Sequence, residues 1–131
     1  MAYIKYKELT QYFNFYKDLT VKELPDYVWD YIGKSEDVIA AYSTLRDKAV
    51  FTTKEIIIFD QRGMFGKSKK IMFFPYNSIS SNSIEYKEDK TILLFVFDSG
   101  YQMRLNFIKM SAERKTEIRK LFFQIKEKCS K

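Results

Sequence analysis

The chain has 131 residues, 46% of them hydrophobic, which fits one domain with a substantial core. Its net charge of +6 favours anionic partners only weakly, because such a charge also keeps a small domain soluble. With no histidine, one cysteine and four glycines, it lacks the commonest general base, a cysteine cluster and a glycine-rich phosphate loop. We therefore expect a protein that is not an enzyme and that uses no metal and no cofactor.

The expected compartment follows from two features. The single cysteine, Cys129, cannot form a disulfide within the chain, which fits a reducing cytoplasm. The longest apolar runs, residues 56–59 and 92–97, are much shorter than a membrane span, and the N-terminus has no apolar signal core. We expect a cytoplasmic protein.

The first part of the chain, residues 5–36, is expected to be helical. Apolar residues recur there about every 3.6 positions, which predicts one apolar stripe: Leu9, Tyr12, Phe13, Tyr16 and Leu19. Thr20 and Glu23 then have the spacing of a capping box.

A second, shorter helix is expected over residues 26–32. Pro25 suits a first helical turn, and Gly33 is a suitable stop. Val28 and Trp29 are expected to be core anchors rather than ligand contacts.

After residue 37 the apolar period changes to two, which predicts about seven short antiparallel strands. We expect them over residues 38–44, 49–60 (bent at Lys54-Glu55), 67–74, 76–86, 91–97 and 101–107. Pro75 should end its strand, and Gly100 should adopt the left-handed conformation in a hairpin loop. In the last strand Tyr101, Met103, Leu105 and Phe107 should face the core.

The chain is expected to close with an amphipathic helix that begins after Ser111, a good N-cap residue. One apolar stripe should bury this helix against the strands: Ile118, Leu121, Phe122, Ile125 and Cys129.

Several segments add a more specific signal to this order of elements. They are residues 38–47 with Arg46-Asp47, residues 50–60 with Phe51-Thr52-Thr53, the pieces Gly63 and Gly66-Lys67, and residues 74–79, which read Phe-Pro-Tyr-Asn-Ser-Ile. Together they resemble the bacterial pleckstrin-homology (PH) domain family over about residues 24–128. The resemblance implies an α+β, mainly β fold, a bent seven-stranded antiparallel barrel capped by a C-terminal helix. The chain would then divide into an N-terminal helical extension, residues 1–36, and a PH-like barrel with its helix, residues 37–131, as one structural unit.

The resemblance also limits the function. Relatives that bind phosphoinositides use a basic loop between the first two strands, whereas residues 45–48 here read Leu-Arg-Asp-Lys, which argues against that ligand. Bacterial members are associated with protein binding, and some resemble subunits of homo-oligomeric rings. Similar short proteins occur in bacteriophages and prophages. The resemblance thus favours a phage-encoded protein-binding or self-assembling module that acts on a host or defence protein.

Two basic groups are candidate sites for an anion or a partner. Four of these residues flank one turn and four lie in the C-terminal segment: Arg62, Lys67, Lys69, Lys70, Arg114, Lys115, Arg119 and Lys120. They could hold phosphates of nucleic acid or anionic lipid, which defines an alternative function as a peripheral module. We favour the view that they are solvated surface charges, because no aromatic residues are interleaved with them for base stacking.

Two strands are apolar on both faces, residues 56–59 and 92–97, so their outer faces also need cover. The aromatic N-terminal segment or a second subunit could supply it. This pattern favours a homo-oligomer.

Overall fold

The computed structural model describes residues 10–15, 17–44, 46–62, 68–109 and 111–129. These residues fall into two compact units. The terminal unit comprises Met1–Phe15 and Tyr76–Lys131, and the middle unit comprises Tyr16–Pro75.

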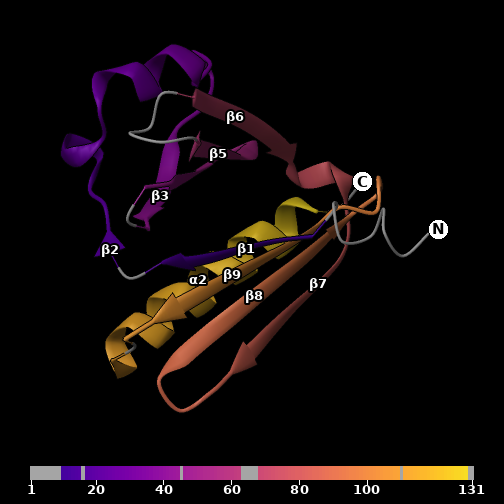
Figure 1. Ribbon diagram of the computed structural model, residues 1–131. Coiled ribbons are helices and arrows are strands. Elements are labelled where there is room, and N and C mark those ends of the chain that lie inside the picture. The colour runs from indigo at the N-terminus through magenta and orange to yellow at the C-terminus, as the bar shows by residue number, and fades with distance from the viewer. Residues whose placement is uncertain (1–9, 16, 45, 63–67, 110, 130–131) are drawn as a thin grey trace. The chain divides into compact units, whose positions relative to one another are not determined.

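The middle unit is built on a five-stranded antiparallel sheet with the strand order β2-β3-β4-β5-β6 (Figure 1). Its strands are β2 (Lys17–Asp18), β3 (Val38–Ser43), β4 (Lys48–Thr52), β5 (Glu55–Arg62) and β6 (Ser68–Pro75). The predicted bend at Lys54-Glu55 is confirmed, because a tight turn there separates β4 from β5. The predicted end of a strand at Pro75 is also confirmed, since β6 stops at this residue.

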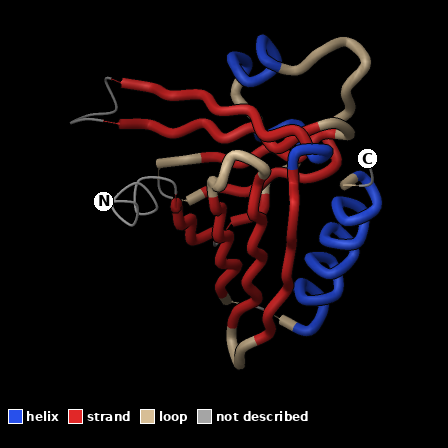
Figure 2. The backbone as a smooth tube through the Cα atoms, turned by 90° about the vertical axis from the view of Figure 1, so that its right-hand side faces the viewer, coloured by secondary structure: helices blue, strands red, loops and turns tan. Residues whose placement is uncertain are grey.

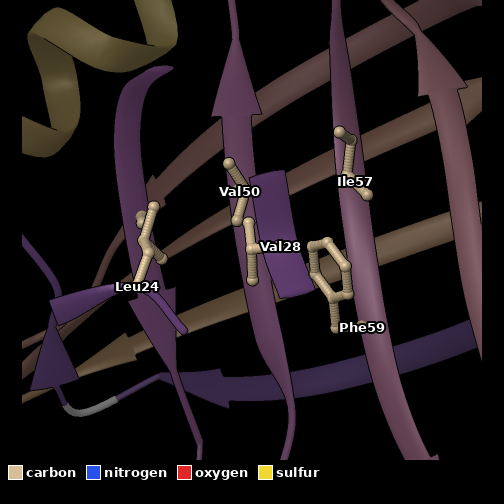
Figure 3. Close-up of a cluster of buried hydrophobic side chains, with 6 residues drawn as sticks. Leu24, Val28, Val50, Ile57 and Phe59 are labelled. Atoms are coloured by element: carbon tan, nitrogen blue, oxygen red, sulfur yellow. The ribbon is translucent and has the colours of Figure 1, made fainter. Parts of the chain in front are cut away.

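Two 3₁₀ helices, η1 (Val21–Glu23) and η2 (Asp26–Tyr31), precede β3, and the segment from Leu24 to η2 packs on one face of this sheet. Leu24 and Val28 pack against Val50, Ile57 and Phe59, and all five side chains are buried (Figure 3). The segment before residue 37 therefore supplies cover for the apolar β5, which is one of the two alternatives that the sequence left open.

The terminal unit contains a four-stranded sheet with the strand order β1-β9-β8-β7. Its elements are β1 (Thr10–Phe15), the 3₁₀ helix η4 (Tyr76–Ser78), β7 (Ile79–Tyr86), β8 (Lys90–Phe97), β9 (Gln102–Ile108) and the helix α2 (Ala112–Lys128). Figure 2 shows α2 running alongside the strands on one face of this sheet.

Helix α2 matches its prediction closely. Ser111 is the N-cap, and its side chain accepts a hydrogen bond from the backbone N–H of Arg114 at 3.1 Å. The predicted stripe is buried at Ile118, Leu121, Phe122 and Ile125, whereas Cys129 is only partly buried. The ring of Phe122 lies 6.3 Å from that of Phe95 in β8, centroid to centroid.

The β8–β9 hairpin also follows the sequence. Gly100 has a φ of 92°, the left-handed conformation that glycine adopts without strain. Met103, Leu105 and Phe107 are fully buried and alternate with partly exposed residues, while Tyr101, just before β9, is half-buried. The mainly β fold with a C-terminal helix is therefore confirmed. The described strands form two sheets, and no closed barrel is found among them.

The prediction of a helix through Leu9, Tyr12, Phe13, Tyr16 and Leu19 is wrong. The described residues of this segment form β1, which pairs parallel with β9, and then β2, which pairs with β3. Phe13 and Phe15 alternate into the core, and the Phe15 ring lies 5.5 Å from that of Phe107. Leu9 and the side chain of Tyr12 lie outside the described residues, as does Tyr16. Pairing with a buried strand overrides the local helical spacing, and aromatic residues suit such pairing.

The short helical region after β2 is confirmed in part. The backbone N–H of Thr20 donates to Glu23 Oε1 at 2.8 Å, the bond that a capping box requires. The helix η2 is 3₁₀ rather than α, with Pro25 as its N-cap. Val28 is fully buried, but the prediction that Trp29 is a core anchor is wrong, because Trp29 is 41% exposed. At three residues per turn, consecutive side chains point 120° apart, so burying Val28 turns Trp29 outward.

Candidate functional site

The first predicted basic group does not form one patch in the described residues. Lys69 and Lys70 are exposed neighbours on β6, so they point to opposite faces of the sheet. The ammonium group of Lys69 lies 3.5 Å from the centroid of the Tyr27 ring, which is a cation–π contact. Lys67 and the side chain of Arg62 lie outside the described residues. Lys69 therefore contributes to packing as well as to charge.

The second basic group divides into two pairs. Arg114 donates to the backbone oxygen of Ile108 at 3.0 Å, and Lys115 donates to that of Glu88 at 3.3 Å. Both side chains are partly buried and tie the start of α2 to its own sheet. Arg119 and Lys120 are exposed on α2. Of the two pairs, only Arg119 and Lys120 present their charge on the outer face of α2. The anion-binding role of all eight predicted residues stays a prediction.

The loop between β3 and β4 is organised by Thr44. The backbone N–H groups of Arg46 and Asp47 donate to Thr44 Oγ1 at 3.2 and 2.9 Å, and the backbone N–H of Thr44 donates to Asp47 O at 2.9 Å. The loop is therefore closed by a threonine hydroxyl, a turn motif that uses these two backbone donors within the loop.

An exposed group of aromatic rings lies on the middle unit, and we call Tyr31 and Phe73 the aromatic surface. Tyr31 is 41% exposed and Phe73 is 45% exposed, and their ring centroids are 6.3 Å apart. Tyr31 also contacts the buried Phe59 at 5.9 Å, and Tyr27 contacts Phe59 at 5.8 Å. The aromatic surface thus rests on the core and is held by η2 and β6.

Sequence reasoning missed the aromatic surface, although one signal for it was present. Phe73 and Phe74 are consecutive in a strand, so they face opposite sides of the sheet and only one can face a given core. Phe73 is the more exposed of the two. The position of Tyr31 beside it depends on how η2 packs, which no spacing in the sequence reveals.

Glu36 and Glu55 both form hydrogen bonds with Thr52 at the β4–β5 turn, an arrangement that sequence reasoning also missed. The hydroxyl of the fully buried Thr52 lies 2.6 Å from Glu36 Oε2, to which it donates a hydrogen bond. The same hydroxyl accepts from the backbone N–H groups of Lys54 and Glu55, both at 3.1 Å. The backbone N–H of Gly33 donates to Glu36 Oε1 at 2.8 Å. Glu36 thus uses both carboxyl oxygens as acceptors.

The two carboxyl groups have opposite pKa shifts. Burial raises the pKa of Glu55 to about 7, and the hydrogen bond to Glu36 and the charge of Glu36 act in the same direction. Burial also acts to raise the pKa of Glu36, but hydrogen bonds from Thr52 and Gly33 outweigh it and hold that pKa below its ordinary value. These shifts favour the ionised form of Glu36 and the protonated form of Glu55.

Metal-binding and membrane-spanning features are both absent from the described part of the chain. No group of three or more histidine, cysteine, aspartate and glutamate side chains gathers there in a way that could hold a metal ion. None of the helices described combines the length and apolar character needed to cross a membrane.

Solved structures with less than 25% sequence identity share the fold. A PH-domain protein of Shewanella loihica is 22% identical with a TM-score of 0.69, and the alignment covers 86% of this chain and 96% of that one. A PH-domain protein of Exiguobacterium sibiricum is 13% identical with a TM-score of 0.67, covering 86% and 61% of the two chains. A PH domain of Shewanella amazonensis is 24% identical with a TM-score of 0.57, covering 86% and 90%.

Sequence comparison agrees with the fold. The uncharacterised protein YjqA of Bacillus subtilis is 42% identical over 52 residues, which are 40% of this chain and 42% of YjqA. The chain thus matches less than half the length of this relative. A family model for the bacterial PH domain matches residues 9–125, so it includes β1 and β2, which the resemblance based on sequence motifs had left out. The chain belongs to the bacterial PH domain family.

Proposed function

We propose that this chain is a non-catalytic module that binds protein, either another copy of itself or a different partner, through the aromatic surface. PH domains are in general interaction modules without catalytic activity, which supports the non-catalytic part of the proposal. The observation that carries the rest is the contact between Tyr31 and Phe73, two rings that pack on each other and are still nearly half exposed.

Aromatic side chains with this degree of exposure are suited to a protein interface. Tyrosine and phenylalanine are enriched in interfaces because they bury a large area and have few rotatable bonds. The Tyr31 ring already rests on Phe59, so little side-chain entropy remains to be lost when a partner covers it. The proposed partner is therefore one that presents an apolar surface to η2 and β6.

The biological setting of the module is part of the same proposal. A phage or prophage gene in a bacterial cytoplasm, with a host or defence protein as the partner, is supported by the family resemblance and by the single cysteine of the chain. Self-assembly into a homo-oligomer is the other form of protein binding that the aromatic surface would serve.

The second candidate function is binding of anionic lipid or nucleic acid. The exposed Lys69 and Lys70 on β6 and Arg119 and Lys120 on α2, together with the net charge of +6, favour it. The contact of Lys69 with Tyr27 weakens it, because an ammonium group held over a ring is less available to a phosphate. We rank this function second.

The test replaces one exposed ring and compares it with a matched control. Phe73→Ser should weaken self-association, or capture of the host partner, by at least about tenfold, because aromatic anchors in an interface often contribute about 2 kcal/mol or more. Tyr86→Ser is the control, since Tyr86 is 51% exposed on a strand of the terminal unit. Native mass spectrometry measures self-association, and quantitative recovery from host lysate measures partner capture. Equal behaviour of Phe73→Ser and Tyr86→Ser in both measurements would rule out the aromatic surface.

A further inference from the structure

Strand β7 forms one edge of the sheet in the terminal unit. It pairs with β8 on one side, and the strand order β1-β9-β8-β7 leaves its other side without a neighbour among the described strands. Five of its eight residues have exposed side chains. The sheet therefore ends in a strand with one open side.

The hydrogen bonds of the β7–β8 hairpin show which backbone groups point toward β8. The N–H of Lys87 donates to Lys90 O at 2.8 Å, so these two residues form a hydrogen-bonded pair at the turn. In an antiparallel ladder, hydrogen-bonded pairs alternate with pairs that are not hydrogen-bonded. Ser83 and Glu85 therefore direct their backbone groups to β8.

The alternate residues of β7 direct their backbone N–H and C=O groups to the open side. We call these groups the open edge, and they belong to Asn82, Ile84 and Tyr86. Within the described parts of the chain, they form no hydrogen bond to another strand or loop. Donors and acceptors that recur at every second residue match the backbone of another extended strand.

The open edge lacks the features that discourage pairing at another edge of this protein. Strand β6, an edge of the other sheet, carries Lys69 and Lys70 and ends at Pro75. Lysine and proline are residues that protect a sheet edge from an added strand. Residues 79–84 of β7 include neither a charged residue nor a proline. Strand β7 is therefore better suited than β6 to accept a further strand.

One face of β7 continues the packed side of its sheet. Asn82 lies opposite Phe95 of β8 in the register, and Phe95 packs against Phe122 of α2, which covers this face (Figure 2). Ile84 points to the same face as Asn82, because residues two apart in a strand share a face. Ile84 is only partly buried. An apolar side chain of an added strand could therefore pack beside it.

We propose that the open edge of β7 binds an extended segment of a partner protein, which adds a strand to the sheet. The segment has apolar residues at alternate positions, one of which packs beside Ile84, and no proline among the residues that bond to β7. A second copy of this chain is a poorer occupant. Its β7 would present mainly serine and asparagine, and both copies carry a net charge of +6. The open edge lies in the terminal unit, so the proposal does not depend on the aromatic surface of the middle unit.

The first experiment selects binders to the full chain from a library of random linear peptides and measures the affinity of a selected peptide by calorimetry. We expect apolar residues with a period of two in that peptide. Methylation of a peptide nitrogen whose N–H bonds to β7 should weaken binding at least about tenfold, because the bond is lost and the methyl group blocks the approach. Methylation at the next residue, whose N–H points away from β7, is the matched control and should have little effect. A library that gives no binder, or a peptide that tolerates both changes, would overturn the proposal.

Hydrogen exchange measured by nuclear magnetic resonance locates the bound peptide. The amides of the open edge should become protected, whereas those of Ser83 and Glu85 should change little because they bond to β8 already. Protection that appears at β1, the other edge of this sheet, and not at β7 would contradict the proposal. Protection of the open edge that rises with protein concentration in the absence of peptide would identify a second copy as the occupant, and would contradict it too.

Two substitutions at Asn82 separate its backbone N–H from its side chain. Asn82→Pro removes an N–H that points to the open side, so it costs no bond to β8 and should lower peptide affinity at least about tenfold in a folded chain. Asn82→Thr keeps the N–H and should bind the peptide as the wild type does. Tyr86→Ser also keeps its backbone groups and should behave in the same way.

Phe73→Ser distinguishes this proposal from the proposed function. It changes the aromatic surface and should leave peptide binding at β7 unaffected. Loss of peptide binding in Phe73→Ser, with Asn82→Pro unaffected, would place the peptide on the aromatic surface and overturn the proposal for β7. If Asn82→Pro fails to fold, the methylated peptides and the exchange measurement on the wild type decide the outcome.

Discussion

At the scale of single residues, two buried threonines differ in the hydrogen bonding of their hydroxyl groups. Thr52 and Thr91 both have no exposed surface. The Thr52 hydroxyl bonds to Glu36 and to two backbone N–H groups. The Thr91 hydroxyl, at the start of β8, has no hydrogen-bond partner among the described residues. A buried hydroxyl without a partner loses its hydrogen bonds to water and forms none within the protein. The Thr91 hydroxyl should therefore lower the free energy of unfolding.

The prediction for Thr91 is a gain in stability. Thr91→Val replaces the hydroxyl with a methyl group of similar volume and should raise the free energy of unfolding by about 1 kcal/mol. The same change at Thr52 should lower it by about 1–3 kcal/mol, because it removes the hydrogen bonds of a buried hydroxyl. Urea denaturation measures both. If both substitutions changed the free energy of unfolding equally, the hydrogen bonds of the Thr52 hydroxyl would not stabilise the fold.

At the scale of elements, α2 provides two adjacent phenylalanines in opposite settings. Phe122 is buried against Phe95, and Phe123 is 52% exposed. The Phe123 ring has the ammonium group of Lys126 5.9 Å from its centroid. Substituting each residue in turn therefore distinguishes the contribution of core packing to stability from that of an exposed side chain on the same helix.

Phe122→Ala should lower the free energy of unfolding by about 3–5 kcal/mol, because it removes a large side chain from a packed core and leaves a cavity. Phe123→Ala should change it by less than about 0.5 kcal/mol, as expected for a surface position. Thermal or chemical unfolding of the two variants gives the comparison. If Phe122→Ala unfolded at the wild-type midpoint, α2 would not be the structural cover of its sheet.

At the scale of the whole molecule, the net charge of +6 allows the two candidate functions to be separated by salt. If protein contact dominates, changing Lys67, Lys69 and Lys70 together to Glu should alter solubility more than assembly, and assembly should depend only weakly on salt. If phosphate contact dominates, the same change should abolish binding to anionic vesicles or oligonucleotides. The slope of log affinity against log salt for DNA should then become shallower by about one for each phosphate that a lysine no longer neutralises. Tight vesicle or DNA binding at physiological salt that this change removes would favour the second function.

Much of the fold could be predicted from the sequence because it depends on local patterns. The period-two strands from residue 38 onward, the β8–β9 hairpin with Gly100 and the N-cap of α2 are all specified by residues a few positions apart. The composition alone likewise shows that the chain has no histidine and no cysteine cluster on which a site could be built.

Other features depended on residues that are distant in the sequence. Residues 10–15 have a spacing that fits a helix, yet they form β1 because β9 offers a parallel partner, with Asn106 Nδ2 donating to Asn14 Oδ1 at 2.9 Å. The contact between Tyr31 and Phe73 and the hydrogen bond between Thr52 and Glu36 arise in the same way. The sequence by itself determined the strands after residue 37, the final helix and the net charge. Tertiary structure decided which edges, rings and carboxyl groups meet, because hydrogen-bond pairing between strands and desolvation depend on neighbours that local periodicity does not encode.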